Sequence, residues 1–186
     1  MSNTVEMLKR YKTASDQELK DLEFIIKAEE IFGDILTREN EFCHLTASSF
    51  VLNRDHTKVL CIYHNIYKSW GWMGGHADGE DDMLFVARKE TREESSFEKF
   101  DLLGAGPISI EVLPVRGHVK NGKYISGHLH LNITYLFEAD ETDLIHISEG
   151  ENSDVAWLEF DELLEKCSED FMKPVYKKII ERVRCY

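Results

Sequence analysis

The chain has 186 residues, of which 42% are hydrophobic and 31% are charged, and its formal net charge is −13. This length and composition indicate one folded domain and exclude an intrinsically disordered chain. The negative charge argues against a general nucleic-acid-binding protein. It does not exclude an anionic small molecule, because divalent cations bound to an acidic site reverse its local field.

Targeting signals and cysteine usage point to the cytoplasm. The first residues, MSNTVEMLKRYK, lack the apolar core of a signal peptide, and no stretch approaches the ~18 apolar residues that cross a bilayer. The four cysteines are scattered and form no C-x-x-C pair, which is typical of free intracellular thiols. We therefore expect a cytoplasmic protein that binds neither membrane nor nucleic acid.

Residues 15–33, SDQELKDLEFIIKAEEIFG, are the first clear helix signal. Ser15 and Glu18 have the spacing of a capping box, and Gly33 is a plausible terminator. The apolar residues predicted to share one face are Leu19, Leu22 and Ile26. Because this helix precedes all strand signals, we expect residues 1–40 to be a helical extension of the main domain, 41–186. The extension would cover the domain peripherally or join two copies in a homodimer.

Strand and helix signals then follow in a mixed order. The strand-like segments are residues 44–53, 58–64, 108–115, 128–139 and 154–160. The helix-like segments are residues 83–96, 161–167 and 174–183, the last with Pro174 in its first turn. Residues 69–82 form a glycine- and acid-rich loop, and residues 116–124 form a polar hairpin or loop. Strands on both sides of a central helix predict a mixed α/β or α+β domain.

The central helix carries an unusual cluster of acids. Glu90, Glu93 and Glu94 stand at i, i+3 and i+4, where each like-charge pair destabilises a helix by roughly 0.2–0.5 kcal/mol. One interpretation is a solvated acidic face balanced by Lys89 and Arg92. The other is a site for a hard divalent cation such as Mg²⁺, which binds carboxylates and substrate phosphates. The helix alone favours neither interpretation.

The preceding glycine loop favours the metal site. From Gly75, five residues lead to Asp81 and seven more lead to Lys89, followed by ETREESSF. This arrangement resembles the Nudix hydrolase signature, G-x(5)-E-x(7)-R-E-U-x-E-E-x-G-U, in which U is a bulky apolar residue. The positions that match at the same spacing are Gly75, Glu90, Glu93, Glu94 and Phe97. The upstream run WGWMGGH is also similar to the family's W-x-L-P-G-G-H segment, at Trp70, Gly74, Gly75 and His76.

Four positions depart from the signature: Asp81, Lys89, Thr91 and Ser96. Lys89 lacks the planar fork with which an arginine orients a carboxylate. Arg88 is no substitute, since one residue along a helix is rotated about 100° away. A left-handed conformation at Ser96 costs roughly 1 kcal/mol without glycine. The departures therefore concern catalytic efficiency more than metal binding.

The resemblance implies a Nudix-type α/β/α sandwich with a mixed β-sheet. It implies Mg²⁺-dependent hydrolysis of a diphosphate linkage, with Mn²⁺ as a substitute cation. The substrate would be a nucleoside diphosphate linked to another moiety, or a related small diphosphate. A non-catalytic ligand-binding module on the same fold is the alternative. Isomerisation of a prenyl diphosphate requires a cysteine near the glycine loop, and none lies between Cys61 and Cys167.

The resemblance also assigns roles by position. The implied metal ligands are Glu90, Glu93, Glu94, the Gly75 carbonyl and, through water or a second cation, Asp81. The implied catalytic residues are Lys89, Glu90 and Glu93. Glu93 is the preferred general base, with Glu149 and Glu151 as alternatives outside the signature.

A basic segment supplies candidates for substrate contact. The predicted substrate-binding residues are Arg116, His118, Lys120, His128, His130 and Trp70. A solvated hairpin, and core packing for Trp70, are the competing interpretations. His128 and His130 share one side of a strand, but no Cys or acidic partner follows at zinc-ligand spacing, so packing or substrate contact is expected. We expect His76 to bond locally, and Cys43 beside His44 to be a buried thiol rather than a nucleophile.

Overall fold

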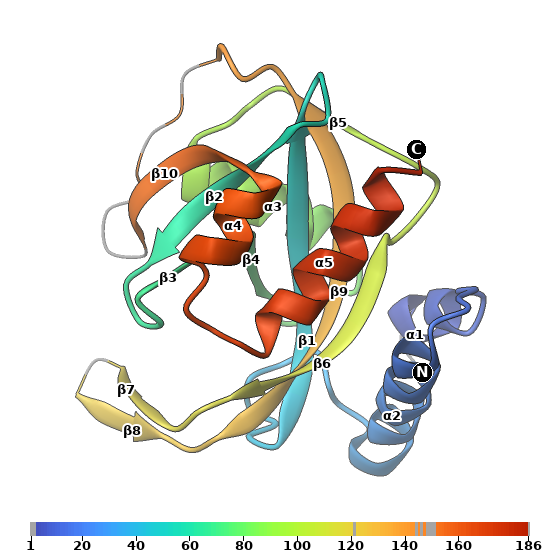
Figure 1. Cartoon of the computed structure of the whole chain (residues 1–186). Coiled ribbons are helices and arrows are strands. Elements are labelled where there is room, and N and C mark those ends of the chain that lie inside the picture. Colours follow the sequence, from blue (N-terminus) through green and yellow to red (C-terminus); the bar gives the residue numbers. More distant parts are fainter. Residues whose placement is uncertain (1–2, 121, 144, 146, 148–151, 186) are drawn as a thin grey trace. The chain divides into compact units, whose positions relative to one another are not determined.

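The computed structural model describes residues 3–120, 122–143, 145, 147 and 152–185 (Figure 1). The helices are α1 (Asn3–Leu8), α2 (Asp16–Phe32), α3 (Met83–Ser95), α4 (Phe160–Lys166) and α5 (Met172–Val183). The strands are β1 (Cys43–Asn53), β2 (Lys58–His64), β3 (Ser69–Gly71), β4 (Met73–His76), β5 (Phe100–Leu102), β6 (Ser109–Val115), β7 (His118–Lys120), β8 (Lys123–Ile125), β9 (His128–Ala139) and β10 (Asn152–Glu159). The predicted α+β class is confirmed.

Most strands join one sheet of eight strands in the order β10-β2-β1-β9-β5. Strand β3 pairs with β2, β4 pairs with β1, and β6 pairs with β9, while β7 and β8 form a separate hairpin. The predicted strands 44–53, 58–64, 108–115 and 128–139 are therefore confirmed. The expected loop 69–82 is corrected in part, because it contains the short strands β3 and β4.

The chain divides into two compact units, each made of three segments. Unit 1 comprises Met1–Ala47, Gly75–Val86 and Ser109–Ile133, and unit 2 comprises Ser48–Gly74, Ala87–Ile108 and Thr134–Tyr186. Strands β1, β4 and β9 and helix α3 contribute residues to both units. The residues of the Nudix-like signature are therefore divided between the units. Gly75 and Asp81 belong to unit 1, and the three glutamates belong to unit 2.

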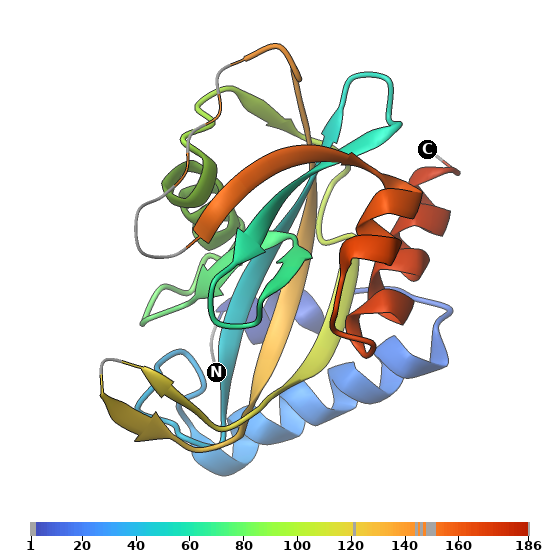
Figure 2. The same ribbon diagram turned by 60° about the vertical axis from the view of Figure 1, so that its left-hand side comes forward.

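In unit 1, helix α2 runs alongside strand β6 (Figure 2). Ser15 caps the helix by accepting from the Glu18 amide, and Gly33 ends it in the left-handed conformation, as predicted. The second hydrogen bond of the capping box, from the Ser15 amide to the Glu18 side chain, does not form. The Ser15 amide instead donates to the Thr13 hydroxyl. The expected apolar face is also corrected, since Leu19 is 43% exposed whereas Ile25 is fully buried.

The buried side of α2 includes Glu18, whose side chain contacts β6. One oxygen of its carboxylate accepts from the Ser109 hydroxyl at 3.0 Å and from the Ile110 amide at 3.2 Å. A polar side chain buried at such a contact is stabilised only because its hydrogen bonds are satisfied. Glu18 and Ile25 each lie one position before a residue of the simple apolar pattern. The buried residues of α2 are Glu18, Ile25, Ala28 and Glu29.

In unit 2, strand β10 pairs antiparallel with β2, and helices α4 and α5 lie side by side next to this part of the sheet (Figure 1). Tyr176 of α5 is almost fully buried, and its hydroxyl accepts from the Trp72 amide at 3.3 Å. Pro174 occupies the first turn of α5, as predicted. No helix among the described residues is both long and apolar enough to cross a membrane.

Candidate functional site

The acidic face of α3 is formed by unit 2 as the sequence predicts. The Glu90 side chain is 13% exposed and that of Glu93 is 53% exposed, and the ammonium group of Lys89 lies 3.3 Å and 3.4 Å from their carboxylates. Partial burial of this ammonium group opposes its charge, but the two carboxylates outweigh it and raise the pKa of Lys89. One lysine therefore screens the repulsion between two of the three clustered acids.

The third acid, Glu94, is buried and held at both its side chain and its backbone. The Gly74 amide donates to Oε2 of Glu94 at 2.8 Å. The side-chain amide of Asn152 donates to the Glu94 carbonyl at 2.8 Å, which satisfies a carbonyl in the last turn of α3. The Glu94 carboxylate is thus fixed in place relative to Gly74, within unit 2.

Gly75 and Asp81 lie in unit 1. Gly75 is a half-buried residue of β4. The Asp81 carboxylate accepts from the Asn3 amide at 2.5 Å and from the Thr4 amide at 2.9 Å, and the Asp81 carbonyl accepts from the Thr4 hydroxyl at 2.7 Å. Both amides belong to the first turn of α1, so Asp81 binds the N-terminus of that helix.

Most of the chain, including this carboxylate face, matches a known protein family. The family model described as NUDIX domain matches residues 44–181. The chain belongs to the NUDIX domain family. It is accordingly a Nudix-type pyrophosphohydrolase, an enzyme that acts on phosphoric anhydrides. A comparison with curated proteins finds no significant match.

Solved structures share the Nudix fold with this chain at low sequence identity. An Ap4A hydrolase binary complex from C. elegans is 17% identical, with a TM-score of 0.58, over 76% of this chain and 98% of that one. A NUDIX-family hydrolase from Clostridium perfringens is 18% identical, with a TM-score of 0.56, over 75% and 97%. The NUDIX domain of Shewanella oneidensis NrtR, complexed with ADP ribose, is 14% identical, with a TM-score of 0.55, over 83% and 97%. The predicted Nudix-type fold is thereby confirmed.

The structure explains the departure at Thr91 and shows the backbone conformation at Ser96. Thr91 is fully buried, and its hydroxyl lies 2.7 Å from the Ser49 hydroxyl and 2.8 Å from the Ala87 carbonyl, so a polar residue is satisfied where the signature has an apolar one. Ser96 adopts the left-handed conformation, with φ 57°, as predicted. The Arg88 guanidinium lies over the Phe137 ring, 5.7 Å from its centre, and so does not replace an arginine at position 89.

The predicted substrate-binding residues lie in several places. Arg116 is exposed between β6 and β7, and its carbonyl contacts Nδ1 of His118 at 3.0 Å. Trp70 is a half-buried residue of β3 whose ring meets the edge of Tyr63. Lys120 belongs to β7, but its side chain lies outside the described part of the chain. The alternative bases Glu149 and Glu151 also lie outside the described residues.

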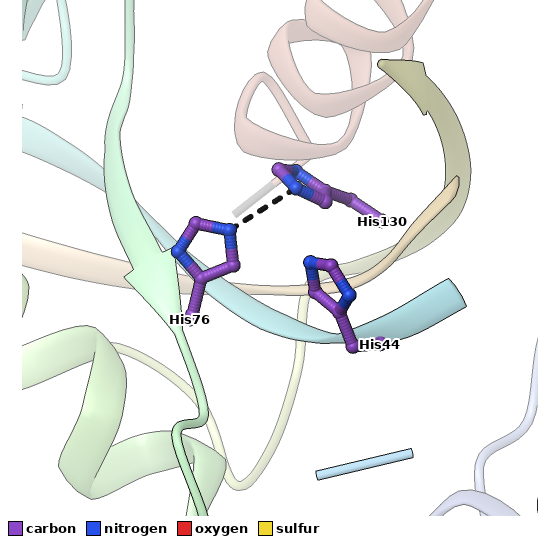
Figure 3. Close-up of side chains that lie close together, drawn as sticks. All are labelled: His44, His76 and His130. Atoms are coloured by element: carbon purple, nitrogen blue, oxygen red, sulfur yellow. Dashed lines mark hydrogen bonds between the residues drawn. The ribbon is translucent and has the colours of Figure 1, made fainter. Parts of the chain in front are cut away.

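Three histidines of unit 1 come together although the sequence places them far apart (Figure 3). His44 lies on β1, His76 on β4 and His130 on β9. The His128 ring centre is 4.9 Å from that of His44 and 5.2 Å from that of His130. Burial, reinforced by the neighbouring histidines, lowers the pKa of His130 to about 2, and burial also lowers the pKa of His44.

Sequence reasoning did not find this cluster or the contacts of Glu94. Three strands of distant sequence supply the histidines, and the HLH pattern in β9 indicated only that His128 and His130 share a side. The paired glycines before His76 were the only signal for the Gly74 contact. No pattern predicted Asn152. Cys43 is buried, as predicted, and its burial raises the pKa of its thiol.

Proposed function

We propose that this Nudix enzyme hydrolyses a diphosphate linkage of a nucleoside diphosphate joined to a second moiety, in a reaction that depends on Mg²⁺. The observation that carries the proposal is the carboxylate face of α3, on which Glu94 is anchored to Gly74 beside the paired Glu90 and Glu93. Carboxylate oxygens are the ligands that Mg²⁺ prefers, so the donor set fits the cation. When bound, Mg²⁺ would neutralise phosphate oxygens and lower the pKa of an attacking water.

The solvent exposure of the three glutamates suggests different roles for them. Glu90 and Glu94 are largely shielded from solvent, and Glu94 is also held by the Gly74 amide, which suits ligands that must hold one geometry. Glu93 is the most exposed of the three and is proposed as the general base, because a base must reach the water that it deprotonates. Lys89 pairs with the carboxylates of Glu90 and Glu93, at 3.3 Å and 3.4 Å, and so offsets their repulsion before a cation or substrate arrives.

Two further ligands are proposed with different support. The Gly75 carbonyl follows the anchored Gly74 directly in the chain. Asp81 is proposed as a helper through water, although its carboxylate already accepts two amide hydrogens of α1. A carboxylate has about four acceptor positions, so the two roles compete without excluding each other. On the substrate side, the proposed contacts to phosphates or base are Arg116, His118, Lys120, His128, His130 and Trp70.

The test is a substrate panel with Mg²⁺ or Mn²⁺ that contains nucleoside triphosphates, nucleotide sugars, dinucleoside polyphosphates and ADP-ribose. The last two compounds are included because proteins with the same fold are an Ap4A hydrolase and an ADP-ribose complex. Glu94→Gln is assayed in parallel, with Glu98→Gln as the matched control, since Glu98 is 77% exposed beyond the end of α3. We expect release of a nucleoside monophosphate by the wild type and by Glu98→Gln only.

Two outcomes would contradict the proposal. Equal turnover by the wild type and Glu94→Gln would assign the activity to a contaminating phosphatase or to other residues. Absence of turnover on every compound, together with metal-free binding of one of them, would identify a ligand-binding module in place of a hydrolase. Calorimetric titration of the same panel distinguishes that second outcome from simple inactivity.

A further inference from the structure

The three-histidine cluster of unit 1 gathers nitrogen ligands from His44, His76 and His130. One ring nitrogen of each residue can be chosen so that all three atoms lie within 4.8 Å of one another. The residues come from three different strands, which are rigid supports for a binding site. Figure 3 shows the three rings turned toward a common centre.

His44 has a buried ring nitrogen whose hydrogen bonding the described residues around it do not satisfy. Its Nδ1 lies 3.1 Å from the Asn40 carbonyl, and because a carbonyl only accepts, Nδ1 carries the hydrogen. The Nε2 atom of the neutral ring therefore has a lone pair. His44 is 4% exposed, and within the described part of the chain its buried Nε2 has no hydrogen-bond partner. Leaving such an atom unsatisfied is unfavourable, and in Figure 3 the ring directs a nitrogen toward the other two histidines.

The contact between His44 and Asn40 is also typical of metal-binding histidines. A ligating imidazole usually donates its second N–H to a backbone carbonyl or carboxylate, which fixes the tautomer and the orientation of the ring. The Asn40 carbonyl supplies that partner here. The ring is therefore oriented and has its lone pair in place before any ligand arrives.

The separation of the other two rings fits a shared ion. The Nε2 atoms of His76 and His130 are 3.2 Å apart, with the rings perpendicular. Two nitrogens bound at about 2.0–2.1 Å to one tetrahedral zinc ion are about 3.3 Å apart. A hydrogen bond between the two imidazoles explains this distance equally well, but it does not explain the unsatisfied Nε2 of His44.

We infer that His44, His76 and His130 form a binding site for a single transition-metal ion, with Zn²⁺ as the expected occupant. Three neutral imidazoles without a thiolate suit Zn²⁺ more than Mg²⁺, which prefers oxygen. Three protein ligands leave a fourth position for water or an anionic oxygen. His128 lies beside the cluster but is not one of the three proposed ligands. The site uses residues other than the α3 carboxylates and is independent of the proposed Mg²⁺ function.

The test measures zinc binding directly by the full chain after removal of metals with a chelator. Zn²⁺ is titrated against a chromophoric competitor in excess Mg²⁺, which keeps hard-cation sites filled. We expect one equivalent to bind to the wild type, and each of His44→Gln, His76→Gln and His130→Gln to weaken binding by about 100-fold or more. Loss of an outer partner alone costs 10–100-fold, so loss of a ligand costs at least as much. Co²⁺ in place of Zn²⁺ should give the visible absorption of a tetrahedral nitrogen site in the wild type but not in the three histidine variants.

Two controls separate this site from others. Glu94→Gln must keep its zinc affinity, because its carboxylate is no part of the cluster. His56→Asn must keep it too, since His56 instead lies 2.7 Å from Glu138 in unit 2, and asparagine tolerates its positive φ. If His44→Gln fails to fold, the half-buried His76 still provides a variant that tests the site.

The outcomes decide the inference. Zinc binding that is equal in the wild type and in folded His76→Gln and His130→Gln would overturn it, and so would absence of zinc binding by the wild type. Binding lost in Glu94→Gln but kept in the histidine variants would place zinc on the α3 carboxylates instead. Thermal unfolding provides a second readout, because added zinc should raise the melting temperature of the wild type and of Glu94→Gln but not of His76→Gln.

Discussion

The backbone amide of Gly74 donates a 2.8 Å hydrogen bond to Oε2 of Glu94, across twenty residues of sequence. This bond ties the glycine segment to the last turn of α3. It gives Glu94 a structural role that is separable from its proposed role as a metal ligand, because the hydrogen bond needs only an acceptor whereas the cation needs a negative charge.

Substitutions at Glu94 should separate these two roles. Glu94→Gln keeps an oxygen for the Gly74 amide, so its free energy of unfolding should lie within about 1 kcal/mol of the wild-type value. Its kcat should nevertheless fall about 100-fold or more, because the negative charge is lost. Glu94→Ala should lose the same activity and in addition about 1–2 kcal/mol of stability, because the partly buried Gly74 amide is left without its acceptor. Urea unfolding and turnover on the best substrate of the panel check both. Equal stability of the two variants would show that the Gly74 bond contributes nothing.

The charge of Lys89 should compete with the metal ion. Its ammonium group lies within 3.4 Å of both Glu90 and Glu93. A unit charge about 4 Å away contributes about 1 kcal/mol in water, so Lys89→Met should bind Mg²⁺ about two- to fivefold more tightly at low ionic strength. The Mg²⁺ dependence of turnover measures this change, and the exposed Lys99→Met is the control. Weaker Mg²⁺ binding would instead mean that Lys89 holds the carboxylates in the geometry that the cation requires.

Asp81 provides a test between capping and metal binding. Its carboxylate accepts two amide hydrogens from the first turn of α1, so Asp81→Ala should destabilise the protein by about 1–2 kcal/mol. If capping is its main role, the folded variant keeps most of the wild-type kcat and its Mg²⁺ dependence. Thermal unfolding and a Mg²⁺ titration of activity are the measurements. A stable variant that requires far more Mg²⁺ would favour the helper role that the Nudix signature implies.

The sequence predicted the elements that have strong periodic signals. Strands β1, β2 and β9 and helix α3 lie within one or two residues of their expected bounds, because long apolar runs and a helical stripe determine them locally. Strands β3 and β4 were missed, since segments of three or four residues rich in glycine become strands only by pairing with β2 and β1.

Tertiary contacts explain the remaining differences at particular residues. The buried face of α2 includes the acidic Glu18, which a hydrophobic pattern assigns to solvent, because its partner Ser109 lies on a distant strand. The clustered glutamates of α3 could be read from the signature. The approach of His44 to His130 could not, because it depends on how β1 and β9 are placed in the sheet.

Ser96 occupies a position that glycine would fill with less strain. It has φ 57° directly after α3, its amide donates to the Arg92 carbonyl at 2.8 Å, and its side chain is exposed. Ser96→Gly should therefore stabilise the protein by about 0.5–1 kcal/mol. Ser96→Ala is the matched control, because it removes the hydroxyl while keeping the strain, and it should give no gain. A gain in both variants would attribute the effect to the hydroxyl group, and chemical denaturation distinguishes the cases.

His64 should make stability depend on pH. Burial lowers the pKa of His64, and its Nε2 donates to the Trp72 carbonyl at 3.0 Å. As pH falls below about 6.5, the unfolded chain gains a proton at His64 that the folded state resists. The contribution of His64 is therefore complete above pH 6.5 and decreases below it, by at most about 1.4 kcal/mol per pH unit.

His64→Gln isolates this contribution. Glutamine can still donate to the Trp72 carbonyl but takes up no proton, so the variant should be less stable than the wild type at pH 7.5 through lost packing. The difference in unfolding free energy between the two proteins should then narrow as the pH falls to 5. Because the other histidines are common to both proteins, their titration cancels in the difference. Urea unfolding at several pH values measures it, and a gap that stays constant or widens toward low pH would show that His64 is protonated at least as readily in the folded state as in the unfolded chain.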